Sequence, residues 1–283
     1  MNTRSVSIIM RSKNEQPYTK SALDSLYSQT FTDFTLHNID SGSDDGTLEV
    51  VKEFNNDVIS IAPSDYVPGK VLNDMVSRTN DEIIVFLNAD AIPQDTEWLA
   101  KLLKPIFDGD ADSTISRQIS RDDAHYIVKF DYERGYNKED KSSAHEMFSA
   151  VACAFKREMW ESVPFYTDGY AEDLVWAIQC QRLGYRFKYV SDSVVEHSHN
   201  YSLKSLFRKK FRHGLVYYRL SGLKPSILKQ SYKMFRELTR DLLRAFKDLK
   251  LLTIPYNFVY RVIIHWAIYR GERKAYIKME SRL

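Results

Sequence analysis

The sequence is poor in cysteine and has no long uninterrupted apolar segment. Two cysteines in 283 residues, Cys153 and Cys180, are too few for a disulfide framework and indicate a reducing compartment. The N-terminal segment MNTRSVSIIMRSKNE has too short an apolar run for a secretory signal. No membrane-spanning helix is predicted, because the most apolar stretch, residues 251–269, is interrupted by Pro255, Asn257, Arg261 and His265.

An excess of charge of one sign is also missing, but the charges are unevenly distributed. The chain has 40 Lys and Arg against 38 Asp and Glu, and 43% of its residues are hydrophobic. This composition excludes disordered and collagen-like proteins. Residues 1–199 carry a net charge of −13, whereas residues 200–283 carry +15. Two regions with different partners are therefore expected, and we place their boundary between residues 202 and 203.

Strand and helix patterns alternate along the first region. Short apolar runs predict strands at 5–10, 34–39, 58–61 and 82–87. Helical spacing lies between them, at 19–28, 47–54 and 71–78. This order predicts an α/β fold with a doubly wound, mostly parallel, Rossmann-like sheet and helices on both faces.

The rest of the chain is predicted in less detail. Residues 110–150 are irregular and polar, with strand signals at 126–132. A buried strand or a helix start, followed by a helix, is expected at 147–160. A helix is expected at 172–183, and short strands at 187–190 and 194–195. From residue 203 the pattern is helical, basic and aromatic, which predicts a C-terminal helical extension over 203–283.

Acidic residues follow three of the predicted strands. Glu15 comes after the first, Asp40 after the second and Asp90 after the fourth. Ligands of such sheets bind outside the carboxyl ends of the strands, so these side chains are expected in one crevice. In Asn88-Ala89-Asp90, a carboxylate at a strand end could hold a divalent cation that bridges two phosphates. The alternative for Asp90 is a helix cap, which the tripeptide alone favours.

Two further acidic segments carry a functional and a structural interpretation each. Asp40 opens the turn Asp-Ser-Gly-Ser-Asp-Asp-Gly-Thr, where it could accept a hydrogen bond from a nucleotide base or could simply form an Asx-turn. Glu172 and Asp173 open an amphipathic helix. A carboxylate there could serve as a general base, and it could equally interact with the helix dipole.

A pair of histidines follows the last predicted strand. His197 and His199 are two residues apart, so in an extended segment both imidazoles lie on one face and could reach a metal ion. Taken singly, each is more often a surface or core histidine.

The order and spacing of these motifs resemble family 2 glycosyltransferases of the GT-A fold, especially bacterial enzymes that build polysaccharides, including rhamnosyltransferase-like members. The resemblance covers residues 5–211. It is carried by VSIIMRSKNE, DSGSDDGT, YVPGKVLNDMV, EIIVFLNADAIP, FSAVACAFKREMWESVPF, YAEDLVWAIQCQRLGYRFKYV and VVEHSHNYSLKSLFRKKF.

The resemblance implies inverting transfer of a sugar from a nucleotide-diphosphate donor with Mn²⁺ or Mg²⁺. It assigns donor binding to Glu15, Asp40 and Asn88, metal binding to Asp90, His197 and His199, and catalysis to Asp173 as base with Glu172. His197 fits the family position better than His199. Two departures are Asn88 in place of an Asp, and Leu72 where many members have Arg before Asn73; Lys70 could supply that cation.

The expected acceptor is a hydroxyl of a saccharide, either lipid-linked or part of a growing surface polysaccharide. The alternative from another class is a non-catalytic protein that binds nucleotides or nucleic acid through its basic region. We rank it lower, because the acidic first region would repel a polyanion. No nucleic-acid partner is expected.

The basic region is expected to act at a surface. A basic, aromatic, helical segment without a continuous apolar span favours peripheral binding to anionic lipids at the inner face of the cell membrane, with the enzyme otherwise cytoplasmic. The same helices could pack against the catalytic domain or form a homo-oligomer.

Overall fold

A computed structural model describes residues 5–55, 57–137, 144–167 and 170–281, and the chain divides into two compact units. The first unit contains residues up to 122 and residues 132–198. The second contains residues 123–131 and those from 199 onward. Segment 123–131 lies inside the expected catalytic domain in sequence but packs with the C-terminal helices.

The first unit is built on an eight-stranded sheet with the order β3-β2-β1-β4-β7-β6-β8-β5. The strands are β1 (Val6–Ser12), β2 (Phe34–Asp40), β3 (Val58–Ser60), β4 (Ile83–Asn88), β5 (Ile92–Pro93), β6 (Ser113–Ile119), β7 (Ala152–Lys156) and β8 (Phe187–Glu196). Strands β1 to β4 are mutually parallel where they pair, whereas β7 runs antiparallel to β4 and β6. The mostly parallel, doubly wound sheet is thus confirmed.

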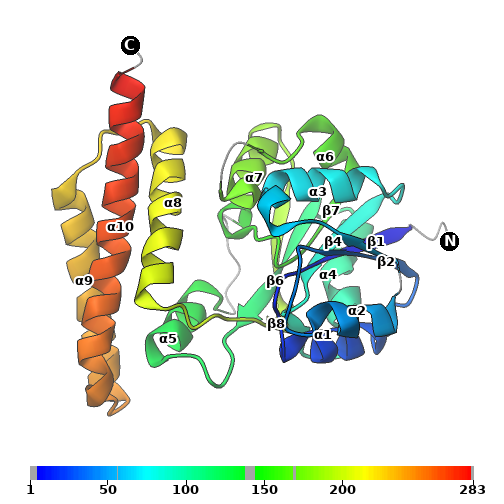
Figure 1. The fold of residues 1–283 in the computed structure, drawn as a ribbon, viewed down its shortest axis with the longest axis horizontal. Coiled ribbons are helices and arrows are strands. Elements are labelled where there is room, and N and C mark those ends of the chain that lie inside the picture. Colours follow the sequence, from blue (N-terminus) through cyan, green and yellow to red (C-terminus); the bar gives the residue numbers. More distant parts are fainter. Residues whose placement is uncertain (1–4, 56, 138–143, 168–169, 282–283) are drawn as a thin grey trace. The chain divides into compact units, whose positions relative to one another are not determined.

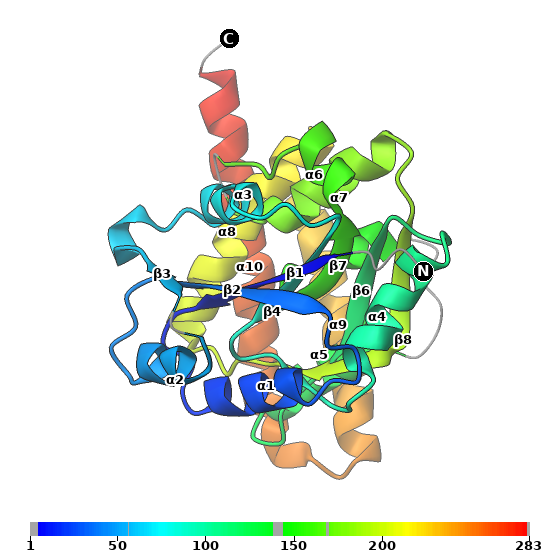
Figure 2. The ribbon, with the colours of Figure 1, turned by 90° about the vertical axis from the view of Figure 1, so that its right-hand side faces the viewer.

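Helices cover both faces of this sheet (Figure 2). On one face, α1 (Tyr18–Tyr27), α2 (Thr47–Phe54) and α4 (Trp98–Phe107) bury their apolar sides against β1 and β4. On the other face lie α3 (Pro68–Ser77), α6 (Arg157–Ser162) and α7 (Glu172–Arg182). Residues of β4 alternate between the two cores, with Val85 in the first and Phe86 in the second. This alternation follows from the two-residue repeat of a strand buried on both faces.

The register brings the carboxyl ends of three strands together. Ser12 on β1 pairs with Asp40 on β2, and Arg11 on β1 pairs with Asn88 on β4. The polar residues that end these strands therefore lie at one edge of the sheet.

The irregular middle region differs most from expectation. The strand expected at 126–132 is wrong, because α5 (Tyr126–Gly135) is a helix that buries Ile127 and Val128. Their β-branched side chains favour a strand only where a partner strand and a matching face exist. Strand β6 was not predicted at all, and β8 runs continuously through the two short strands expected at its ends.

The second unit contains three long helices that lie side by side (Figure 1): α8 (Leu203–Ser221), α9 (Ile227–Lys247) and α10 (Ile254–Glu280). Helices α8 and α10 meet at two glycines. A Cβ atom on Gly214 would lie 2.2 Å from the carbonyl oxygen of Ile268, and one on Gly271 would lie 2.2 Å from that of Phe211. Only glycine permits this approach of the two backbones.

Several polar side chains are buried inside this helical unit. Arg261 on α10 is buried, and it donates to both carboxylate oxygens of Asp131 on α5 and of Asp241 on α9 at 2.6 to 3.0 Å. These carboxylates raise the pKa of Arg261 although burial alone would lower it. His265, one turn further along α10, contacts Glu237 and Gln230 at 3.2 Å.

One helix of the described residues, within Leu251–Glu280, meets the length and hydropathy criteria for a membrane span. This differs from the expectation drawn from the sequence. A third of its most apolar window is buried inside the protein, and its interrupting residues Asn257, Arg261 and His265 are buried. The criterion alone does not distinguish such a helix from the core helix of a soluble protein.

Candidate active site

A pocket opens where β1, β2 and β4 end. Its lining residues are Arg11, Ser12, Lys13, Glu15, Ser41, Pro63, Tyr66 and Asn88. Two of the residues expected to bind a donor, Glu15 and Asn88, are among them. All of these residues except Pro63 carry a polar or charged side-chain group, so the pocket offers hydrogen-bond partners to a polar ligand.

Asp40 is buried beside this pocket and organises the turn that forms one wall. Its Oδ1 accepts hydrogen bonds from the backbone of Gly42 and Ser43 at 2.9 and 2.8 Å, and its Oδ2 accepts from the hydroxyls of Ser12 and Ser43. Burial would raise the pKa of Asp40, but these hydrogen bonds hold it below its usual range. Asp40 thus forms the Asx-turn, while its neighbour Ser41 lines the pocket.

Helix α3 supports the site through packing and hydrogen bonds and does not supply the positive charge expected from Lys70 to the pocket. Lys70 is exposed in its first turn and is not among the residues that line the pocket, whereas Leu72 is fully buried in the core. Asn73 accepts hydrogen bonds from the backbone N–H of Phe165 and the indole N–H of Trp160, both at 2.8 Å. Asn73 therefore holds Trp160 and Phe165, which precede α7 in the sequence, against α3.

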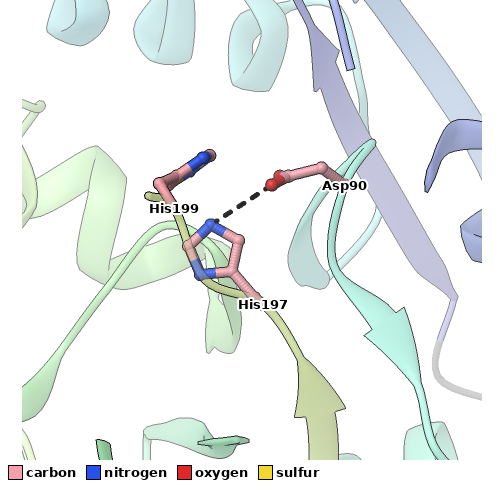
Figure 3. Close-up of side chains that lie close together, drawn as sticks. All are labelled: Asp90, His197 and His199. Carbon is pink, nitrogen blue, oxygen red and sulfur yellow. Dashed lines mark ion pairs between the residues drawn. The ribbon is translucent and has the colours of Figure 1, made fainter. Parts of the chain in front are cut away.

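Asp90, His197 and His199 form a cluster (Figure 3). One ligand atom of each lies within 4.8 Å of the other two. Asp90 is buried in the turn between β4 and β5, and the next helix, α4, begins only at Trp98, so the helix-cap alternative is wrong. One carboxylate and two imidazoles are a suitable set for a divalent cation with positions left for phosphate oxygens.

The orientation of His197 supports this arrangement. Its Nδ1 lies 3.0 Å from Oε1 of Gln118 on β6, and its Nε2 lies 3.5 Å from Oδ2 of Asp90. Because Gln118 Oε1 can only accept, Nδ1 donates in this contact, which leaves Nε2 as the atom that would bind a cation beside Asp90. The Gln118 contact has the geometry of an outer partner of a metal ligand.

Arg121 is a site residue that sequence reasoning missed. Its Nη2 lies 3.1 Å from Asp90 Oδ2, its guanidinium also donates to the carbonyl oxygens of Asp90 and Ser198, and it stacks 3.6 Å from the ring centre of Tyr18. Arg121 follows β6, the strand that the pattern did not reveal, so no sequence signal marked it.

Glu15 belongs to the same charged group. Burial raises the pKa of Glu15 to about 8, the charge of Asp90 adds to this effect, and Arg121 opposes it. A cation bound at Asp90 would favour the ionised form of Glu15.

The second carboxylate pair lies at the start of α7. Burial and the charge of Asp173 raise the pKa of Glu172 to about 7, and Arg11 opposes this effect. Burial also raises the pKa of Asp173, against hydrogen bonds from the backbone N–H groups of Leu174 and Ala150. A carboxylate that changes protonation near neutral pH is well matched to proton transfer. Gly169, which precedes this motif, lies outside the described residues.

Arg11 connects the pair to the pocket. Its Nη2 donates to Oδ1 of Asn88 at 3.1 Å and to the carbonyl oxygen of Ala150 at 3.2 Å, and its Nη1 lies 3.8 Å from Oε1 of Glu172. Sequence reasoning overlooked Arg11, although a basic residue directly after an apolar strand was a visible signal. The resemblance implies an Asp at the position of Asn88, whereas this chain has an amide there that accepts a hydrogen bond from Arg11.

Comparison with known proteins identifies the family of the chain. The family model for glycosyl transferase family 2 matches residues 7–159, more than half of the chain. The chain is 26% identical over 228 residues to the O-antigen chain rhamnosyltransferase RfbN of Salmonella typhimurium, which covers 75% of this chain and 72% of that protein.

Solved structures share the fold. The mannosyltransferase PcManGT from Pyrobaculum calidifontis, solved with GDP-Man and Mn²⁺, superposes with a TM-score of 0.63 at 19% identity, over 95% of this chain and 86% of that one. The glucosyl-3-phosphoglycerate synthase of Mycobacterium tuberculosis, solved with Mg²⁺ and UDP, gives a TM-score of 0.57 at 22% identity, over 79% and 82% of the two chains.

Proposed function

Because the chain belongs to glycosyltransferase family 2 and is a glycosyltransferase, we propose that it transfers a sugar, with inversion, from a nucleotide-diphosphate donor to a saccharide hydroxyl. The observation that carries this proposal is the presence of two acidic groups near Asn88, the Asp90 cluster and the Glu172–Asp173 pair. The Asp90 cluster suits a cation, and the Glu172–Asp173 pair, joined to Asn88 through Arg11, suits proton transfer.

Asp90, His197 and His199 would hold the metal ion. A cation held by these residues would supply positive charge to stabilise the departing diphosphate. Two nitrogen ligands beside one carboxylate favour Mn²⁺ over Mg²⁺, since Mg²⁺ strongly prefers oxygen ligands. Gln118 fixes the ring of His197, and Arg121 adds a permanent positive charge beside Asp90.

The nucleotide would occupy the pocket between Ser41, Glu15 and Asn88, with Asp40 shaping the turn that contacts the base. Lys70 is exposed at the start of α3 and does not line the pocket. It would contact the phosphates of the donor only if α3 moved towards the pocket. Rhamnose is the first donor sugar to test, since the curated relative is a rhamnosyltransferase.

Asp173 would act as the base. It accepts the proton of the acceptor hydroxyl as the oxygen attacks the anomeric carbon and the bond to the diphosphate breaks, so a single displacement inverts the configuration. Glu172 shares the burial and raised pKa of the pair, and it would hold Asp173 and the acceptor in place.

The acceptor would be a lipid-linked saccharide or a growing surface polysaccharide, as the O-antigen role of the relative suggests. This acceptor would be met at the cytoplasmic face of the membrane, to which the basic helical unit would bind peripherally. A homo-oligomer through the same helices is the competing role of that unit.

A screen of nucleotide sugars with Mn²⁺, read by thermal shift and by slow release of nucleoside diphosphate, tests the proposal. Metal-dependent stabilisation by one nucleotide sugar, with release of the diphosphate, is expected. Tight, salt-sensitive binding of DNA or RNA without any such release would instead support the binding-protein alternative.

A further inference from the structure

Helix α9 buries its polar side and exposes its apolar side. Gln230 and Asp241 are buried, and Glu237 pairs with Arg261 and His265 of α10. The opposite side carries six large apolar residues that are 41 to 80% exposed: Leu228, Tyr232, Phe235, Leu242, Leu243 and Phe246. Their spacing places them along one stripe of the helix. A helix on the surface of a soluble protein normally has the reverse arrangement.

The apolar stripe continues onto the neighbouring helix. Leu238 and Leu242 of α9 line a shallow pocket together with Ile254 and Phe258 of α10. Phe258 is itself 52% exposed. The turn between the two helices adds Leu249 and Leu252, which are 83% and 97% exposed. We call this surface, from Leu228 to Phe258, the apolar face. Large apolar side chains exposed together along one side of α9 and at the start of α10 mark an interaction site.

A row of basic residues runs beside the apolar stripe on α9. Lys229, Lys233, Arg236, Arg240, Arg244 and Lys247 repeat every three or four positions. Five of them directly follow a residue of the apolar stripe, so the basic row lies about 100° around the helix from it. Lys229, Arg236 and Lys247 are exposed.

We propose that the apolar face lies in the interface of an anionic lipid bilayer, with α9 parallel to the membrane plane and its basic row at the headgroups. Apolar side chains beside a basic row, on a helix with a polar opposite side, are the pattern of an interfacial helix. A second copy of this chain fits less well, because residues 200–283 carry +15 and would repel each other.

The position of α10 fits this surface role. Arg261 and His265, which interrupt its apolar run, form the polar contacts that hold α9 against α10. Because the polar side of α9 faces α10, the apolar face is the side of α9 that is free to contact lipid. The inference extends the proposed function, since it rests on a lipid-linked acceptor for its purpose, but its test needs no turnover.

Flotation of the full chain with vesicles tests the inference. The wild type is expected to float with vesicles of phosphatidylglycerol and phosphatidylcholine, to bind them more weakly at high salt, and to be released by alkaline carbonate. The double variant Phe235→Asp/Phe246→Asp should lose at least about 100-fold in vesicle affinity, since two large side chains no longer leave water. Leu183→Asp is the matched control, because Leu183 is 61% exposed on the other unit.

A second variant separates the charge from the apolar contact. Lys229→Gln/Arg236→Gln/Lys247→Gln should weaken binding to the anionic vesicles about 5-fold per charge removed, and should leave binding to phosphatidylcholine alone unchanged. Thermal unfolding confirms that each variant folds.

Three results would overturn the inference. The first is that the wild-type protein does not float with anionic vesicles at low salt. The second is a double variant that floats as well as the Leu183→Asp control. The third is a wild-type dimer in light scattering that the double variant converts to monomer while neither protein floats, since this would assign the face to a second copy. A failed donor screen with normal flotation would count against the proposed activity alone.

Discussion

Arg121 Nη2 and Asp90 Oδ2 lie 3.1 Å apart, and the same carboxylate oxygen lies 3.5 Å from Nε2 of His197. The carboxylate expected to anchor a metal ion is thus already paired with one buried cation. Arg121 limits the negative charge that the cluster would otherwise bury, and its remaining hydrogen bonds fix the turn of Asp90 against Ser198.

Asp90→Asn is expected to abolish stimulation by Mn²⁺ while the protein stays folded. The amide keeps the size of the side chain and a hydrogen-bond acceptor for Arg121, but it removes the charge that attracts the cation. Turnover titrated with Mn²⁺ measures the effect. Asp108→Asn, at an exposed position, is the control. Metal-stimulated turnover close to wild type in Asp90→Asn would show that the metal lies elsewhere.

Gln118→Leu is expected to lower metal affinity by about 10- to 100-fold, the usual cost of losing an outer partner of a metal ligand. The leucine no longer accepts the hydrogen bond from Nδ1 of His197, so the ring is not held towards Asp90. Calorimetric titration with Mn²⁺ alone measures this. Gln181→Leu on the exposed side of α7 should bind as tightly as the wild type. Equal affinities in all three proteins would contradict the prediction.

Asp173→Asn is expected to reduce sugar transfer by at least about 100-fold, the typical cost of removing a general base. Donor binding should persist, because the pocket residues are unchanged. Transfer assays combined with donor calorimetry separate the two effects, and Asp192→Asn serves as an exposed control. A fully active Asn variant would exclude Asp173 as the base.

Arg11→Met is expected to move the acidic limb of the pH–rate profile to higher pH. The positive charge of Arg11 lowers the pKa values of Glu172 and Asp173, which burial raises. Without it, the pair holds its proton to higher pH, so the base form appears later as pH increases. The pH dependence of kcat/KM reports this shift, whereas a purely structural loss would lower the rate equally at every pH. Arg182→Met, at the other end of the helix that carries Glu172 and Asp173, should leave the limb in place.

Arg261→Met is expected to lower the free energy of unfolding by about 3 to 5 kcal/mol, because Asp131 and Asp241 are left without their shared cation in the helical unit. Denaturant unfolding measures this loss. Arg270→Met, an exposed position on the same helix, should change stability little. A loss of similar size in both variants would indicate a general effect of shortening α10 side chains.

The sequence by itself determined the order of the strands and helices up to Asn88, and the edge of the sheet where polar residues collect. The apolar runs that end in Asp40 and in Asn88-Ala89-Asp90 predict buried strands. A strand buried on both faces carries polar residues mainly at its end, so these residues lie at the edge of the sheet. The strand expected at 126–132 failed because β-branched residues fit any buried surface, including the face of α5.

Only the tertiary structure decided which charges meet. Arg11, Gln118 and Arg121 reach Asn88, His197 and Asp90 from positions 77, 79 and 31 residues away in sequence, and no local pattern encodes such contacts. The same holds for α9. Its periodicity reveals an apolar stripe and a polar stripe, but periodicity does not state which one faces inward. Arg261 of α10, by pairing with Asp241 and Glu237, turns the polar stripe into the bundle and leaves the apolar stripe outside.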